Sequence, residues 1–84
     1  MLKLPRRDTI LWRMLVSWAC RDQATFGQIV EIYINSGSFA RRSGIEMNVG
    51  RYIKRYGKRH YDAAGKPYWV INPELKDIII KEAK

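Results

Sequence analysis

The sequence predicts a small α+β domain that is mostly helical and carries one β-hairpin. From residue 9 to residue 56, apolar residues recur every three or four positions, which indicates amphipathic helices. After Gly57 the pattern changes to short β-prone runs, and helical spacing returns after Asn72. A chain of 84 residues, 46% of them hydrophobic, is expected to form one domain, 1–84, around one small core.

The first helix is predicted over 9–21, with Asp8 as its N-cap. Its apolar stripe is extended round the helix by Trp12, Val16 and Ala19. A stripe this wide has two interpretations. Either the helix is the central core helix of a monomer, or these three residues form the interface of a homodimer.

The second helix is predicted over 26–35. Thr25 and Gln28 have the spacing of a capping box, in which each side chain accepts a hydrogen bond from the other residue's backbone N–H. Gly37 suits the left-handed residue that follows a helix.

Two shorter helices are predicted over 38–43 and 47–56, with a turn at Gly44 between them. Ser38 is the expected cap of the first. The second is expected to end at Gly57, and its buried stripe is Val49, Tyr52, Ile53 and Tyr56.

The rest of the chain predicts a hairpin and a last helix. Two β-prone runs within 58–72 are separated by the short sequence AAG, a connection of hairpin length. Asn72 is then the expected cap of a helix over 73–83, with Pro73 at its first position.

The positive charge of the chain is concentrated in one segment. Sixteen Lys and Arg against eight Asp and Glu give a net charge of +8. Residues 41–60 contain seven of these basic residues and one acidic residue, a net charge of +6 within twenty positions. A concentrated positive field attracts polyanions. Nucleic acid is the first candidate partner, and an anionic membrane surface is the second.

Other chemistry has little support in the sequence. One cysteine, Cys20, and one histidine, His60, are too few for an internal disulfide or a structural zinc site, and we expect Cys20 to be a buried thiol. Acidic residues are scattered singly, and no Gly-rich phosphate loop or membrane-spanning run is seen. We therefore expect no catalytic residue, metal, cofactor or small-molecule ligand, and a cytoplasmic protein.

The segment FARRSGIEMNVGRYIKRYG combines a small residue, a glycine and two aliphatic residues at the spacing of a known motif. These residues are Ala40, Gly44, Ile45 and Ile53. Together with the hairpin that follows, they resemble the winged helix-turn-helix family over about residues 25 to 72. The resemblance implies that Ala40 allows two helices to approach closely and that Gly44 makes the turn between them.

Gly50 departs from the family pattern, which has a buried aliphatic residue at this place. The nearest aliphatic residue here is Val49. Either the turn is one residue shorter, or the second helix begins at a different phase. Gly50 would also let the helix backbone approach a phosphate closely.

The resemblance implies that helix 47–56 enters the major groove of duplex DNA, and that the hairpin is a wing on the adjacent backbone or minor groove. The residues predicted to contact base edges are Asn48 and Arg51. Those predicted to contact phosphates are Arg41, Arg42, Lys54, Arg55 and Lys58. The wing is predicted to contribute Lys58, Arg59, His60 and Lys66.

These features predict a small dimeric transcriptional regulator that binds specific double-stranded DNA and is nucleoid-associated when bound. One alternative is a protein-binding winged helix, anchored by an exposed Trp69 or Trp12. A second is non-specific binding of DNA or RNA through charge. The simplest alternative is a pair of basic helices that are only well solvated.

Overall fold

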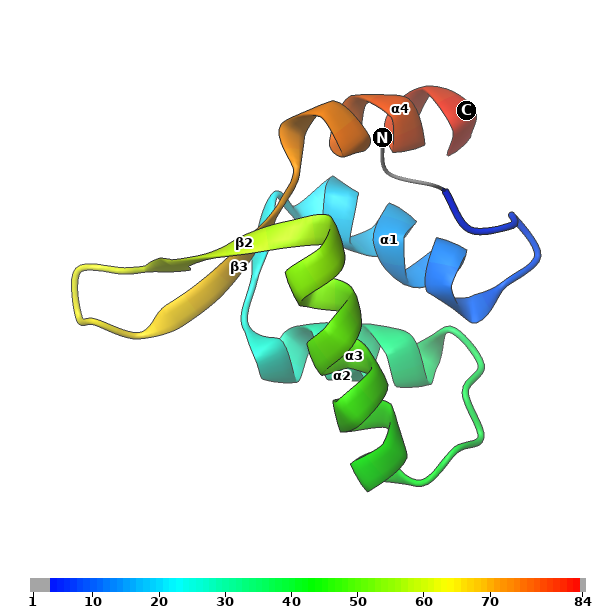
Figure 1. Cartoon of the computed structure of the whole chain (residues 1–84), viewed down its shortest axis with the longest axis horizontal. Helices are drawn as coiled ribbons and strands as arrows, with labels where there is room; N and C mark the ends of the chain where they lie inside the picture. Colours follow the sequence, from blue (N-terminus) through cyan, green and yellow to red (C-terminus); the bar gives the residue numbers. More distant parts are fainter. Residues whose placement is uncertain (1–3, 84) are drawn as a thin grey trace.

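Helix α1 (Ile10–Arg21) is the central element of the fold, which the computed structural model describes for residues 4–83. It packs against α4 (Pro73–Ala83) and against α2 (Phe26–Asn35). Helix α3 (Arg42–Tyr56) packs on α2. Figure 1 shows α1 between α4 above and the α2–α3 pair below. With a three-stranded antiparallel sheet, these four helices make the described residues a small α+β fold.

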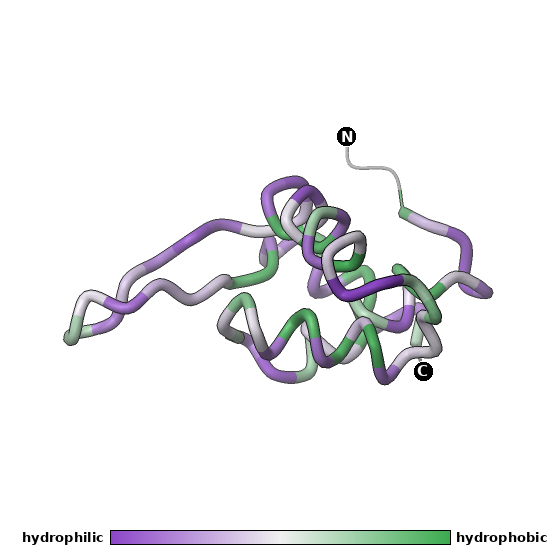
Figure 2. Tube along the Cα trace, turned by 90° about the horizontal axis from the view of Figure 1, so that it is seen from below, coloured by the Kyte–Doolittle hydropathy of each residue, from purple (hydrophilic) through white to green (hydrophobic). Residues whose placement is uncertain are grey.

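The sheet consists of β1 (Gln23–Ala24), β2 (Gly57–Tyr61) and β3 (Pro67–Ile71), with β3 between the other two. Strands β2 and β3 form the predicted hairpin, which extends away from the helices (Figure 1). In Figure 2 the outer part of the hairpin is mostly hydrophilic, whereas the hydrophobic segments gather among the helices. The hairpin therefore adds a polar projection to the helical body.

Short-range sequence signals correctly predicted several boundaries. Thr25 and Gln28 form the capping box, with hydrogen bonds of 2.9 and 3.2 Å between each backbone N–H and the other side chain. Gly37 has a φ of 111° after the end of α2. The Asn72 side chain accepts a hydrogen bond from the backbone N–H of Glu74 and so caps α4.

The N-cap of α1 is Thr9 rather than the predicted Asp8. The Thr9 hydroxyl accepts a hydrogen bond of 3.2 Å from the backbone N–H of Trp12. Asp8 instead forms an exposed ion pair with Arg6. Both residues can cap a helix, and the extended backbone at Thr9 decides between them.

The predicted helix over 38–43 and the predicted turn at Gly44 are wrong. Residues 36–41 form the connection between α2 and α3, and α3 runs without interruption through Gly44. Phe39 is 101% exposed, so the connection has no apolar stripe to bury and no packing that would favour a helix. Ile45 is 2% exposed, and burying it extends the core stripe of α3 by one turn. This burial offsets the helical cost of Gly44, which is about 1 kcal/mol.

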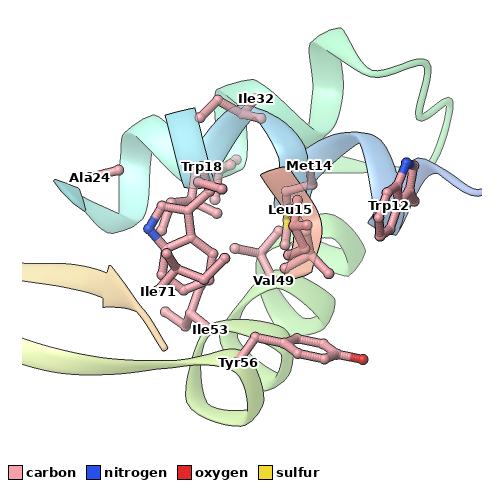
Figure 3. Close-up of a cluster of buried hydrophobic side chains, with 14 of the residues drawn as sticks. Trp12, Met14, Leu15, Trp18, Ala24, Ile32, Val49, Ile53, Tyr56 and Ile71 are labelled. Atoms are coloured by element: carbon pink, nitrogen blue, oxygen red, sulfur yellow. The ribbon is translucent and has the colours of Figure 1, made fainter. Parts of the chain in front are cut away.

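The sequence left open how the helix accommodates Gly50, and the buried residues of α3 show its phase. Val49 is fully buried, and the stripe continues through Ile53 and Tyr56. In Figure 3, Val49 and Ile53 lie beside side chains of α1 in the core. A Cβ at Gly50 would meet nothing within 4 Å, so Gly50 lies beside the core stripe and not in it. Ala40, predicted to lie between two closely packed helices, is exposed in the connection.

The wide stripe of α1 belongs to the core of a single chain. Trp12 is 7% exposed and Ala19 is 1% exposed, and only Val16 is half-buried. Their second side is covered because α4 packs on α1. The prediction of a dimer interface is therefore corrected for Trp12 and Ala19, which are buried within one chain.

Cys20 is exposed, which corrects the expectation of a buried thiol. It follows Ala19 at the end of α1, one position beyond the buried stripe. None of the helices within residues 4–83 has the length and apolar character needed to cross a membrane.

Trp18 joins α1 to the hairpin and to the end of α3. Its indole Nε1 donates a hydrogen bond of 3.1 Å to the carbonyl oxygen of Trp69 on β3, and its ring is fully buried. A Cβ at Gly57, where α3 becomes β2, would lie 2.5 Å from Trp18 Cη2 and 2.5 Å from the carbonyl oxygen of Val70. Only glycine permits this approach.

We expect Gly57→Ala to lower the free energy of unfolding by about 1–3 kcal/mol, because the added methyl group must displace a buried ring or a strand. Gly57 has a φ of −153°, which alanine adopts readily, so the cost comes from the clash alone. Urea denaturation followed by tryptophan fluorescence measures it. Gly27→Ala is the control, because its Cβ would meet nothing within 4 Å. Equal stability of Gly57→Ala and the unmodified protein would contradict the close approach.

We expect Trp12→Glu to unfold the chain or to lower its stability by roughly 3–5 kcal/mol, because it removes a buried ring and introduces a charge. Thermal denaturation followed by circular dichroism tests this. Val16→Glu, at the half-buried neighbour, should cost much less. A Trp12→Glu protein with unchanged stability and a smaller sedimentation coefficient would instead support a dimer interface at Trp12.

Candidate nucleic-acid interface

The outward side of α3 lies opposite its buried stripe. Met47, Arg51 and Lys54 are exposed there, at the i, i+4 and i+7 positions of one helix face. The Arg51 guanidinium donates a hydrogen bond of 2.7 Å to Asn48 Oδ1, and Asn48 is half-buried. The two residues predicted to contact base edges are therefore not equivalent. Arg51 extends from the surface, and Asn48 orients it.

A groove at the junction of α3 and the hairpin collects three basic side chains. Arg55 comes from the last turn of α3, and Lys58 and His60 come from one face of β2. Val70 and Asn72 also line the groove. No acidic residue is found among the described residues that line this groove. Because α3 continues directly into β2, the backbone places Arg55, Lys58 and His60 close together.

The hairpin register separates the predicted wing residues into two faces. Lys58 pairs with Val70 and His60 with Tyr68, so these residues share a face, and the His60 and Tyr68 rings stack with centroids 5.7 Å apart. Arg59 pairs with Trp69 on the other face of the hairpin and is exposed. Its guanidinium lies 5.4 Å from the centroid of the neighbouring Tyr61 ring. A ligand bound on the groove side of the hairpin would therefore contact Lys58 and His60 but not Arg59.

Lys66 lies at the tip of the hairpin, where Asp62 organises the turn. Asp62 Oδ1 accepts hydrogen bonds of 2.9 Å from the backbone N–H groups of Ala64 and Lys66. Gly65 has a φ of 78°, a conformation that favours glycine. The tip is therefore ordered by one side chain, and Lys66 is exposed at its end.

Arg42 is engaged in contacts that join α2 to α3. Its guanidinium pairs with Glu31 at 3.1 Å and with Glu46 at 3.2 Å, and the hydrogen bond with Glu31 is the main cause that raises the pKa of Arg42. A tyrosine pair, Tyr33 and Tyr52, packs between the same helices. Burial, followed by the proximity of Tyr52, raises the pKa of Tyr33. Two carboxylates thus lie beside Arg42 and would compete with a phosphate for it. Arg41, in the connection before α3, is exposed.

Two exposed apolar side chains near the basic surface were not among the predicted site residues. Met47 is 70% exposed on the outward side of α3, and Phe39 is 101% exposed in the connection before it. The helical spacing of α3 already placed Met47 opposite Val49, so the signal was present in the sequence. The tryptophans proposed as protein-binding anchors are less available, since Trp12 is buried and Trp69 is half-buried.

The described residues contain no group of three or more His, Cys, Asp or Glu side chains that could hold a metal ion. Comparison with protein-family models, with curated proteins and with solved structures finds no match to this chain.

We expect Asp62→Ala to loosen the hairpin tip, because two backbone N–H groups lose their acceptor. Amide hydrogen exchange of Ala64 and Lys66 should accelerate, while exchange in α1 stays unchanged. Asp62→Asn keeps the Oδ1 acceptor and should retain slow exchange. If Asp62→Ala and Asp62→Asn exchange alike, the turn does not depend on this side chain.

Proposed function

We propose that this chain is a winged helix-turn-helix protein that binds specific sequences of duplex DNA. In this proposal α2 and α3 are the helix pair, α3 is the recognition helix, and the β2–β3 hairpin is the wing. The observation that carries the proposal is the basic surface that runs from Arg51 on α3 to Arg55, Lys58 and His60 in the junction groove. None of the ion pairs found among the described residues involves Arg51, Arg55, Lys58 or His60.

The geometry suits the major groove. An α-helix fits there, and an arginine can donate two hydrogen bonds to one guanine. Arg51 is the proposed base-contacting residue, and its hydrogen bond to Asn48 holds it in a defined direction before DNA binds. The remaining basic residues of the surface are exposed, which suits contacts with phosphates. They are Arg41, Lys54, Arg55, Lys58, His60 and Lys66.

The direct passage from α3 into β2 supports simultaneous contact by helix and wing. With no linker between them, the groove residues Arg55 and Lys58 lie three positions apart at the junction of helix and strand. A protein of this kind acts by occupying its site, so we propose a role in regulating transcription. Two copies on a near-palindromic site would place two α3 helices about 34 Å apart, one turn of the duplex.

A protein-binding role is the second candidate, and Phe39 is the observation that favours it. A fully exposed phenylalanine in a loop can anchor a partner protein by filling a pocket. The basic surface favours DNA over this alternative, because it offers several positive groups and few apolar ones.

The test is a fluorescence titration of the protein against DNA duplexes selected from a random pool. With about five phosphate contacts, log Kd should change with log salt concentration with a slope of about 5. Arg51→Ala should reduce discrimination between the selected and random duplexes by about 1–3 kcal/mol. Arg55→Ala should weaken all duplexes alike and reduce the slope by about one.

Arg42→Ala is the matched control for these variants, because the Arg42 charge is already paired with Glu31 and Glu46. It should leave the salt slope unchanged. Absence of duplex binding at low salt would refute the proposal. Equal affinity for every sequence would leave only non-specific binding through charge.

A further inference from the structure

Met47 is an apolar side chain at the centre of a basic helix face. It is 70% exposed, one helical turn before Arg51 and two before Lys54. Packing of the core does not require a methionine at position 47, since Met47 lies on the side of α3 opposite Val49 and Ile53. A single exposed methionine is common on protein surfaces, so a second observation is needed.

Two glycines flank Met47 on the surface of α3. At 3.6 residues per turn, Gly44 and Gly50 lie about 60° to either side of Met47. A Cβ at either glycine would meet nothing within 4 Å, and neither glycine has a positive φ. The fold therefore needs neither glycine, although glycine within a helix costs about 0.5–1 kcal/mol relative to alanine. Because Gly44 and Gly50 have no side chains, the helix surface is low three residues before and three residues after Met47.

A helix with a protruding side chain between two glycines fits a deep groove with two walls. A major groove has a phosphate backbone on each side, and small flanks let a helix sink between them. The floor of the groove displays the 5-methyl group of thymine, which an apolar side chain contacts favourably. Methionine is unbranched and flexible, so it adapts to such a contact.

We propose that Met47 reads a thymine methyl group in the major groove, and that Gly44 and Gly50 let α3 approach closely enough for this contact. The inference rests on the proposed function and names part of its target. Arg51 follows Met47 by four residues, or about 6 Å along the helix. At about 3.4 Å per base step, a guanine bound by Arg51 would lie about two steps from the thymine.

The first experiment replaces each thymine of the selected duplex, one at a time, by deoxyuridine, which removes only the methyl group. At one position the replacement should weaken binding of the unmodified protein about fourfold, the value of one buried methyl group. Met47→Ala should bind the thymine and deoxyuridine duplexes equally at that position. Replacement of thymines outside the contacted region should change neither protein's affinity.

The second experiment uses Gly50→Ala, which should raise the melting temperature because alanine favours the helix. It should nevertheless weaken binding to the selected duplex about tenfold, since the methyl group prevents close approach. Gly27→Ala in α2 is the matched control, because its Cβ also meets nothing within 4 Å. It should not weaken binding.

The outcomes separate this inference from the function on which it rests. Absence of duplex binding at low salt removes both. Sequence-specific binding in which deoxyuridine affects the unmodified protein and Met47→Ala alike, or affects neither, overturns the role of Met47 alone. Unchanged affinity of Gly50→Ala overturns the close approach of the helix. Binding of a partner protein that Met47→Ala abolishes, with duplex affinity unchanged, would assign Met47 to a protein contact instead.

Discussion

The close approach of the Trp18 ring to Gly57 sets the relation between the helices and the hairpin. Trp18 lies on the central helix α1, while Gly57 is the point at which α3 becomes β2. The Trp18 indole also donates its N–H to the backbone of β3 at Trp69. One buried side chain thus contacts three elements, and its partner must be a glycine because a Cβ would lie 2.5 Å from the ring. Because Gly57 lies where α3 becomes β2, this contact anchors that junction to α1.

The acidic residues of the chain also shape the basic surface, because several of them pair with basic residues elsewhere. Glu31 and Glu46 hold Arg42 between α2 and α3, and Lys76 of α4 pairs with Asp22. At the hairpin tip, Asp62 accepts hydrogen bonds from backbone groups. Exposed pairs of this kind contribute little stability, about 0–1 kcal/mol each. Their main consequence concerns the location of charge, because the described residues that line the junction groove include no acidic side chain.

Much of the fold could be predicted from local sequence signals, and the errors of the prediction have identifiable physical causes. Capping residues act over three positions, so Thr25 and Asn72 correctly predicted where helices begin. The turn at Gly44 was wrong because the local cost of glycine is smaller than the gain from burying Ile45, and that burial depends on the rest of the core. Strand β1 has two residues and no periodicity, so only its pairing with β3 defines it.

By itself, the sequence determined the α+β class and the concentration of positive charge in residues 41–60. These properties depend on neighbouring residues or on simple counts. The tertiary structure decided that α4 covers the second side of α1, and that two carboxylates occupy Arg42. It also decided that Gly57 must be a glycine while Gly50 need not be one for the fold. Each of these depends on which side chains, distant in the sequence, pack against one another. Only the packing of the whole chain determines this.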